Sequence, residues 1–198
     1  VMFNESDRKD RCLNKYLSFS AAPGKEYVEV TKRMSESAFS GRLRSLKPGD
    51  RVLLKGPLGN CVFDERYRKI SFLIGGIGIT PVISILEYVA QRGLDNDIVL
   101  LYSNRTEEEI AFRKELDRIA ALSGNIKVKY IVTDCEPRDR SCSMGRIDGP
   151  AVEKAVQDIR ERVVFVFGPP GMVDAIKKIC LEMGVPSGNL KTENFVGY

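Results

Sequence analysis

The sequence predicts two parts: a partial antiparallel Greek-key β-barrel over residues 1–66 and an α/β domain with a parallel sheet over residues 67–198. Two observations support this expectation. From Lys69 onward, near-continuous apolar strands alternate with helical segments, which is typical of a parallel sheet covered on both faces. Before Lys69, short β-type runs are separated by turn sequences, which is typical of antiparallel strands.

The barrel part carries alternating runs between turns. Residues 27–34 (YVEVTKRM) alternate between apolar and polar side chains, and residues 50–56 (DRVLLKG) overlap the end of a KPGD turn. Further turn sequences occupy 21–26 and 56–60. We therefore expect strands at 27–34 and 50–56.

The α/β part repeats a strand followed by a helix. Pro150 occupies the first turn of one expected helix, a favoured position, and Gly184 ends another. In chain order, the expected strands are 69–76, 97–104, 125–133, 162–168 and 189–195. The expected helices are 80–92, 107–122, 149–159 and 170–183.

The composition excludes several kinds of site. The chain has no histidine, which removes the usual general base, the Ser-His-Asp and Cys-His catalytic pairs and most zinc sites. Its five cysteines contain no C-x-x-C pair and lack iron–sulfur spacing, so we expect neither a disulfide framework nor a metal centre. Redox or group-transfer chemistry would then require a bound cofactor.

The net charge is +4, and acids and bases are mixed along the chain. This favours a solvated mixed-charge surface and no nucleic-acid binding, with a modest basic patch for an acidic protein as the alternative. No apolar run reaches the ~18 residues of a membrane helix, and no leader is apparent, so we expect a cytoplasmic protein. Because residue 1 is valine, we also expect the sequence to begin inside a longer chain.

Residues 75–81 (GGIGITP) join the first strand of the α/β part to its first helix. Gly76 and Gly78 fill two positions of the G-x-G-x-x-G fingerprint, but Pro81 occupies the third. Glycines let the backbone approach a pyrophosphate, the following helix directs N–H groups at the anion, and Thr80 adds a hydroxyl. An ordinary turn capped by threonine explains the same residues, and both interpretations stay open.

Two more loops follow strands at the same edge of the predicted sheet, where open α/β sheets bind ligands. Residues 102–106 (YSNRT) offer polar and basic groups, but no acid, where a Rossmann-type site selects a ribose hydroxyl or a 2′-phosphate. Residues 168–172 (GPPGM) form a loop with two prolines. The alternatives are a helix start capped by Thr106 and a loop that the prolines merely stiffen.

Together these motifs resemble one family, the ferredoxin–NADP⁺ reductase superfamily of flavin oxidoreductases. Its nucleotide domain has a GGxGxTP turn, a Y-x-N-R-T segment followed by a phenylalanine and an acidic helix, a G-R-I segment and a C-G-P-P-x-M loop. The corresponding residues here are 75–81, 102–106 with Phe112 and Glu115, 145–147, and 168–172. Phe167 replaces the family's cysteine, and the resemblance implies that its side chain lies near the nicotinamide.

The N-terminal half resembles the flavin barrel of the same family. Residues 15–18 (KYLS) match its R-x-Y-S segment, with Lys15 in place of the arginine that pairs with the flavin diphosphate and Leu17 in place of the stacking aromatic. Lysine still neutralises phosphate, whereas leucine does not stack equivalently. Ser37 falls where the family places a hydroxyl on the flavin phosphates, with a helix cap as the alternative. The family's first barrel strands have no counterpart here, so we expect them to be missing.

The resemblance implies an FAD-dependent NAD(P)H oxidoreductase. Hydride would pass between nicotinamide C4 and flavin N5 where the domains meet, and single electrons would pass to or from an acidic carrier such as ferredoxin or flavodoxin. The implied catalytic residues are Ser18, Glu193 and Tyr198. The implied cofactor-binding residues are Lys15, Tyr16, Leu17, Ser18, Ser37, Gly75, Gly76, Gly78, Thr80, Pro81, Ser103, Asn104, Arg105, Gly168, Pro169, Pro170, Met172, Phe195 and Tyr198.

Several finer expectations follow from the resemblance. The absence of an acid at 103–105 favours NADPH over NADH, because an acid there would repel a 2′-phosphate. Phe195 and Tyr198 are expected to face the flavin, and Tyr198 to cover it, with a frayed tail as the alternative. The alternative functions are a reductase subunit of a larger oxygenase, hydrogenase or dihydroorotate dehydrogenase-type complex, or a redox-inactive nucleotide-binding module.

Overall fold

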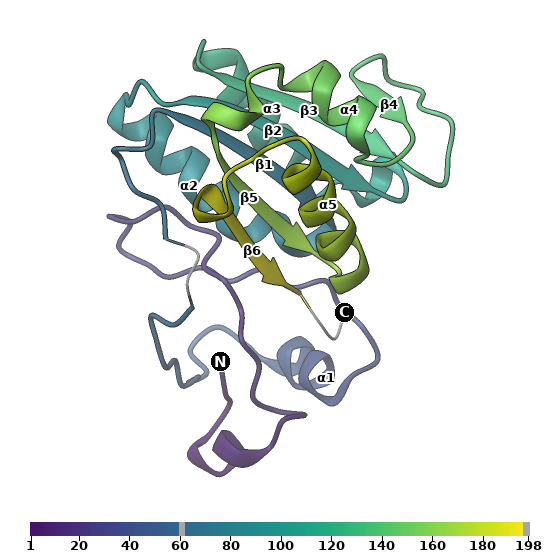
Figure 1. Ribbon diagram of the computed structural model, residues 1–198. Helices are drawn as coiled ribbons and strands as arrows, with labels where there is room; N and C mark the ends of the chain where they lie inside the picture. The colour runs from purple at the N-terminus through teal and green to yellow at the C-terminus, as the bar shows by residue number, and fades with distance from the viewer. Residues whose placement is uncertain (60–61, 196–198) are drawn as a thin grey trace.

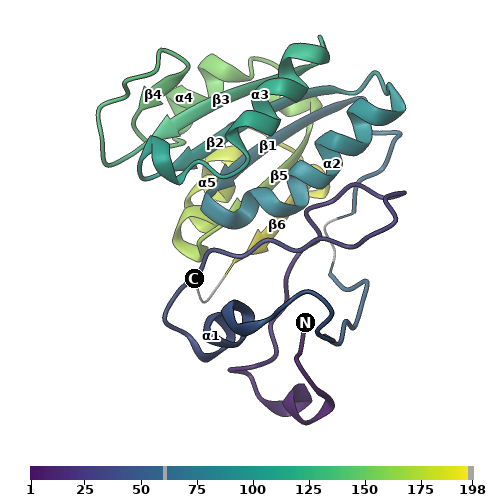
Figure 2. The same ribbon diagram turned by 180° about the vertical axis from the view of Figure 1, so that it is seen from behind.

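The computed structural model describes residues 1–59 and 62–195. Its centre is a six-stranded sheet, parallel throughout, with the strand order β4-β3-β2-β1-β5-β6 (Figures 1 and 2). The chain enters at β1 in the middle, moves outward to β4, and returns on the other side of β1. The strands are β1 (Lys69–Gly75), β2 (Asp97–Asn104), β3 (Ile126–Val132), β4 (Cys142–Met144), β5 (Val163–Gly168) and β6 (Leu190–Asn194).

Helices cover both faces of this sheet, so the central strands are buried nearly throughout. Successive side chains on a strand point to opposite faces: Phe72 packs under α2 and α3, whereas Leu73 packs under α4 and α5. The α-helices over the sheet are α2 (Ile79–Arg92), α3 (Arg113–Leu122), α4 (Gly149–Ala155) and α5 (Pro170–Glu182). The 3-10 helices are η2 (Gly76–Gly78), η3 (Glu107–Glu109), η4 (Ile159–Glu161) and η5 (Ser187–Asn189).

The expected strands of the α/β part are confirmed to within a residue or so, but two helices are shorter than expected. The segment expected as one helix over 107–122 splits into η3 and α3, because Phe112 takes a left-handed conformation with φ 58°. The segment expected at 149–159 ends as α4 at Ala155. Strand β4 was not predicted, because three residues are too few to produce a pattern.

The expected barrel is not evident in the described residues up to 66. This part contains η1 (Glu5–Lys9) and α1 (Ala38–Ser45), and its β pairing is limited to the single bridges Met2–Leu53 and Phe19–Val30. The strands expected at 27–34 and 50–56 therefore do not form ladders, since a ladder needs a neighbour along its length. Large apolar side chains stay exposed in this part of the chain: Tyr16, Phe19, Tyr27, Val28, Met34, Val52, Leu53, Leu54, Leu58 and Val62.

The N-terminal part packs on α2, the helix that follows the glycine-rich turn. Ser84 Oγ donates a hydrogen bond of 2.8 Å to the Ala21 carbonyl. Glu87 pairs with Lys25 at 2.7 Å, and the two side chains are only 15% and 25% exposed. The helix that begins at the glycine-rich turn therefore also holds the 21–25 segment.

Within residues 1–59 and 62–195, no helix combines the length and apolarity needed to cross a bilayer. In the same residues, no three histidine, cysteine, aspartate or glutamate side chains are grouped to hold a metal ion. The described cysteines are free thiols: Cys12, Cys135, Cys142 and Cys180.

Candidate functional site

A cavity of about 1120 Å³ lies between the N-terminal part and the carboxyl edge of the sheet. Residues 14–19 and 54–59 line it from one side. The start of α2 and the end of β6 line it from the other. The cavity thus opens where the two parts of the chain meet, at the edge where parallel α/β sheets bind ligands.

The cavity gathers residues that the sequence predicted from both halves. From the N-terminal half these are Lys15, Tyr16, Leu17 and Ser18, and from the C-terminal half Pro81, Glu193 and Phe195. Tyr16 is 84% exposed and Leu17 is half-buried. Tyr198, the third expected catalytic residue, lies outside the described residues.

The lining is strongly basic. Six of its described residues carry positive side chains, and the single acid is Glu193. Two of the basic residues are close enough to interact: burial, and then the charge of Lys15, lower the pKa of Lys32. Such a surface suits a polyanion with apolar parts. The basic residues are Arg8, Lys9, Arg11, Lys15, Lys32 and Lys55; the sequence predicted only Lys15, because the others follow no motif.

Glu193 reaches the cavity from β6. It pairs in register with Phe167 of β5, and burial raises the pKa of its carboxyl. The pairing of β6 with β5 continues one residue further, because the Phe195 N–H donates to the Gly168 carbonyl at 2.9 Å. Phe195 packs toward Phe167, whose ring is 1% exposed and belongs to the core. The Phe167 side chain is therefore part of the core and is not among the described residues that line the cavity, and the expectation that it lies near the nicotinamide stays a prediction.

The glycine-rich turn combines an open position with a tightly packed one. Gly76 has φ 53° and space above it, so a ligand can approach its backbone. Gly78 instead packs on β5: a Cβ there would lie 2.8 Å from the Phe167 carbonyl oxygen. The Thr80 hydroxyl donates to the Ile77 carbonyl at 3.1 Å, so it is used within the turn.

The 168–172 loop lies against this turn. A Cβ on Gly75 would collide with the Met172 sulfur and lie 3.3 Å from Pro169 Cδ, and Gly168 closely approaches Gly75. Pro170 begins α5. Two motifs 90 residues apart in the sequence therefore form one continuous surface at the carboxyl ends of β1 and β5.

The loop after β2 presents one exposed basic group. Ser103 is half-buried, Asn104 is 5% exposed, and Arg105 is exposed. Neither amide atom of Asn104 has a hydrogen-bond partner, although both are buried. Arg105 pairs with Asp134, which comes from the loop after β3, at 4.0 Å. The sequence missed Asp134, because no motif marks it and the pairing depends on strand order.

Ser37 acts as a helix cap, as the alternative interpretation expected. Its hydroxyl accepts a hydrogen bond from the Ser40 N–H at 3.3 Å at the start of α1. It does not line the cavity described above.

Comparison with known proteins agrees with this geometry. The oxidoreductase NAD-binding domain family matches residues 72–178. NADH-cytochrome b5 reductase 2 of Debaryomyces hansenii is 30% identical over 186 residues, which cover 90% of this chain and 62% of the relative. The chain spans less than two thirds of the length of the first curated relatives that it matches.

Solved structures share the fold. The cytochrome b5 reductase domain of nitrate reductase from Ulva prolifera has 27% identity and a TM-score of 0.70, with 89% of this chain and 71% of that chain covered. The flavohem-like FAD/NAD-binding domain of nitric oxide dioxygenase from Vibrio cholerae O1 biovar El Tor has 20% identity and a TM-score of 0.79, covering 90% and 76%. With the family match, the glycine-rich turn and the parallel sheet, this chain belongs to the FAD/NAD(P)-binding oxidoreductases of the ferredoxin–NADP⁺ reductase type.

Proposed function

We propose that this chain is the catalytic part of an FAD-dependent NAD(P)H oxidoreductase. It would move hydride between NAD(P)H and FAD, and single electrons to or from a carrier protein. The observation that carries this proposal is the basic cavity of about 1120 Å³, which residues from both halves of the chain line together. A dinucleotide is polyanionic and partly apolar, and this lining offers both kinds of contact.

The nicotinamide nucleotide is proposed to bind along the carboxyl edge of the sheet. The open backbone at Gly76 and the start of α2 would receive its diphosphate. The 168–172 loop would flank the nicotinamide half, and residues 103–105 would contact the adenosine half. These roles follow from the packing of the two glycine loops and from the position of each loop at the end of its strand.

The residues of the N-terminal part offer positive charge for the diphosphate of FAD, but no aromatic side chain in the position where the family stacks one on the flavin ring. Lys15 and Lys32 line one cavity close together and would hold the diphosphate, with Ser18 beside them. Leu17 offers apolar contact to the ring without an aromatic face. Bound FAD would supply the group that accepts hydride and releases single electrons. The division into domains at 66/67, with the first as a partial flavin domain, belongs to this proposal.

Glu193 is proposed to act at the mouth of the cavity. Its raised pKa, caused by burial, lets it hold a proton at its carboxyl closer to neutral pH than an exposed glutamate does. As the one acid among the described lining residues, it would orient a nicotinamide carboxamide by hydrogen bonding. Phe195, fixed to Gly168 through its N–H, would close the apolar side.

The position of Asp134 supports NADH rather than the NADPH that the sequence favoured. The sequence expectation rested on the lack of an acid at 103–105, but Asp134 lies beside Arg105. A 2′-phosphate would have to compete with this carboxylate for the guanidinium and would be repelled by it. The names of the relatives do not decide between the two nucleotides, because NADH appears in that of the Debaryomyces hansenii protein and NADPH in that of a Mycosarcoma maydis nitrate reductase.

The electron carrier is proposed to be an acidic protein. Residues 1–66 contain 13 basic and nine acidic residues, whereas 67–198 contain 18 of each, so the net positive charge lies in the first part. Ferredoxin, flavodoxin and cytochrome b5-type carriers stay open. A role as the reductase subunit of a larger complex is compatible with the same charge distribution.

A redox-inactive nucleotide-binding module is the second candidate function. It is favoured by Leu17 in the stacking position and by the single-residue β bridges of the N-terminal part. Incubation with FAD, removal of free FAD by desalting, and a visible spectrum distinguish the two. The proposal expects a retained flavin spectrum that is lost in a Lys15→Met, Lys32→Met double variant. A colourless wild-type protein supports the binding module.

A further inference from the structure

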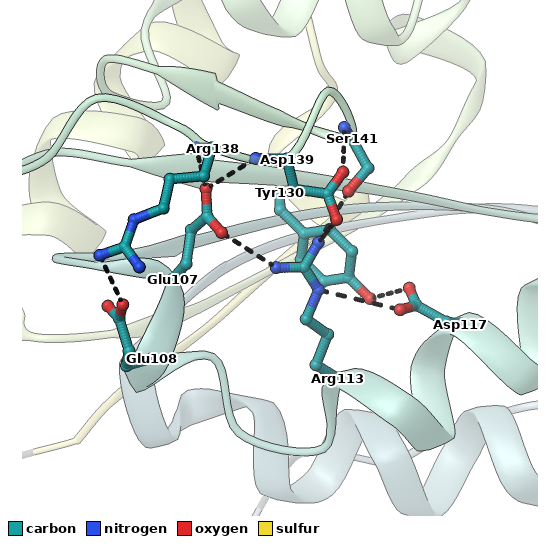
Figure 3. Close-up of polar contacts among 8 residues, drawn as sticks. All are labelled: Glu107, Glu108, Arg113, Asp117, Tyr130, Arg138, Asp139 and Ser141. Atoms are coloured by element: carbon teal, nitrogen blue, oxygen red, sulfur yellow. Dashed lines mark hydrogen bonds and ion pairs between the residues drawn. The ribbon is translucent and has the colours of Figure 1, made fainter.

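An interconnected group of charged side chains joins the loop after β3 to the start of α3. In the strand order of the sheet, β3 lies away from β6, whose end lines the basic cavity. Its centre is Arg113, the first residue of α3 (Figure 3). The guanidinium lies over the Tyr130 ring, with 5.0 Å between Cζ and the ring centroid. It is 21% exposed, so its charge interactions are stronger than those of a surface pair.

Three carboxylates surround this one guanidinium. Arg113 contacts Asp139 at 2.7 Å, Glu107 at 3.7 Å and Asp117 at 3.8 Å. It also donates to Ser141 Oγ at 2.8 Å. These partners come from η3, α3 and the 133–141 loop, so the arginine joins three segments.

Two of these carboxylates also accept hydrogen bonds from other groups. Glu107 accepts the backbone N–H groups of Arg138 and Asp139, at 2.6 and 3.2 Å. Asp117 accepts the Tyr130 hydroxyl at 2.6 Å, and burial followed by this contact raises the pKa of Tyr130. Without Arg113, the three carboxylates would repel one another, and the 133–141 loop would be held to η3 by Glu107 and by the Arg138–Glu108 ion pair of 3.1 Å.

The loop that this group holds is the one that reaches the loop after β2. Thr133 N–H donates to the Asn104 carbonyl at 3.1 Å, and Asp134 N–H donates to the Arg105 carbonyl at 2.9 Å. The Asp134 carboxylate then faces Arg105. Moving the 133–141 loop would therefore change the groups offered to the adenosine ribose.

We infer that Arg113 is a positioning residue for the adenosine half of the nicotinamide nucleotide: it holds the 133–141 loop closed and so fixes Asp134 beside Arg105. This inference rests on the proposed nucleotide site. The arginine acts through the loop and does not itself touch the cofactor. It should therefore influence nucleotide affinity and leave the rate of hydride transfer unchanged.

The test uses ADP-ribose, which carries the adenosine half and needs no flavin. Calorimetric titration should give an affinity about tenfold weaker for Arg113→Gln than for wild type. Arg113→Lys should recover part of the lost affinity, because lysine keeps the positive charge but lacks the planar guanidinium that can contact several carboxylates at once. Arg118→Gln removes the same charge from an exposed position on the same helix and should bind like wild type.

Steady-state kinetics give the second readout, which a general loss of structure would not reproduce. Arg113→Gln should raise KM for NADH with kcat unchanged. If Arg113→Gln does not fold, Asp139→Asn removes the shortest ion pair and should weaken ADP-ribose binding several-fold.

The failures are distinguishable. Wild-type protein that binds neither ADP-ribose nor NADH would overturn the proposed function. Wild-type protein that binds ADP-ribose, with Arg113→Gln or Asp139→Asn equal to it, would overturn the positioning role alone. A fall in kcat with KM unchanged in Arg113→Gln would also overturn the positioning role.

Discussion

Replacing Asp134 with asparagine should shift the nucleotide preference toward NADPH. In the structure the Asp134 carboxylate lies 4.0 Å from Arg105, with side chains 56% and 74% exposed. Such an exposed pair contributes only about 0.2–1 kcal/mol to stability, so the variant should fold normally. Its influence on a bound 2′-phosphate is larger, because the phosphate carries nearly two negative charges.

The magnitude follows from Coulomb's law. Two unit charges about 4 Å apart in water interact by ~1 kcal/mol, and a phosphate bound to Arg105 lies farther from Asp134 but carries roughly twice the charge. Removing the carboxylate also leaves Arg105 free to pair with the phosphate. We expect a total effect of about 1–1.4 kcal/mol, which is a five- to tenfold rise in the NADPH/NADH ratio of kcat/KM.

The assay compares kcat/KM for both nucleotides at low salt in wild type, Asp134→Asn and Glu136→Gln. Glu136 is exposed on the same loop, so its variant controls for a charge change that does not face Arg105. An unchanged ratio in Asp134→Asn would refute the reasoning. An equal shift in Glu136→Gln would show that only net charge matters.

Three further outcomes are expected. Gly78→Val should lower Tm and abolish NADH oxidation, because the Phe167 backbone leaves no room for a Cβ, at a packing penalty of about 1–3 kcal/mol. Glu193→Gln should stabilise the protein at pH 7 but not near pH 4. Burial raises the pKa of the Glu193 carboxyl in the folded protein, so wild type loses stability as the pH rises through that pKa and the carboxyl becomes charged, whereas glutamine stays neutral. Arg162→Leu should destabilise by about 1–3 kcal/mol, because Arg162 is 4% exposed and donates to the Ile70 and Asp97 carbonyls, which would lose this donor.

The Gly78 and Arg162 outcomes each have a control or a contrary result. Gly171→Ala meets open space and should keep the wild-type Tm, so an equal loss there would undercut the packing argument. Arg162 holds the pKa of Asp158 at about 2 through a side-chain hydrogen bond. Wild type should therefore lose this contribution as pH falls from about 4 to 2, whereas the Leu variant lacks it at every pH. If the stability of wild type and of the Leu variant fell equally as the pH was lowered over this range, the result would contradict this.

The α/β part was predictable because its signals are local. The central strands β1, β2 and β5 are runs of mainly apolar residues buried on both faces, and α5 begins at Pro170 and ends just before Gly184, two recognisable residues. The break at Phe112 was not predictable, because nothing in its type demands a left-handed conformation. The barrel expectation failed for a different reason: alternation at 27–34 indicates a possible strand, but a ladder forms only beside a partner.

The site was predictable where a motif marks it and not where strand order creates it. Residues 15–18 and Glu193 were expected and do line one cavity. Asp134 and Arg113 were missed, because their importance depends on the loops after β2 and β3 lying side by side. The packing of Gly78 was also missed: a Cβ there would meet the Phe167 backbone of β5, and its expected role at a phosphate stays a prediction.

The most direct test of the central claim is an anaerobic titration of the FAD-reconstituted protein with NADH, followed by visible absorbance. We expect the oxidised flavin band to bleach with about one equivalent of NADH and to return when a one-electron acceptor is added. A protein that retains FAD but whose band is unaffected by excess NADH and by excess NADPH would contradict it.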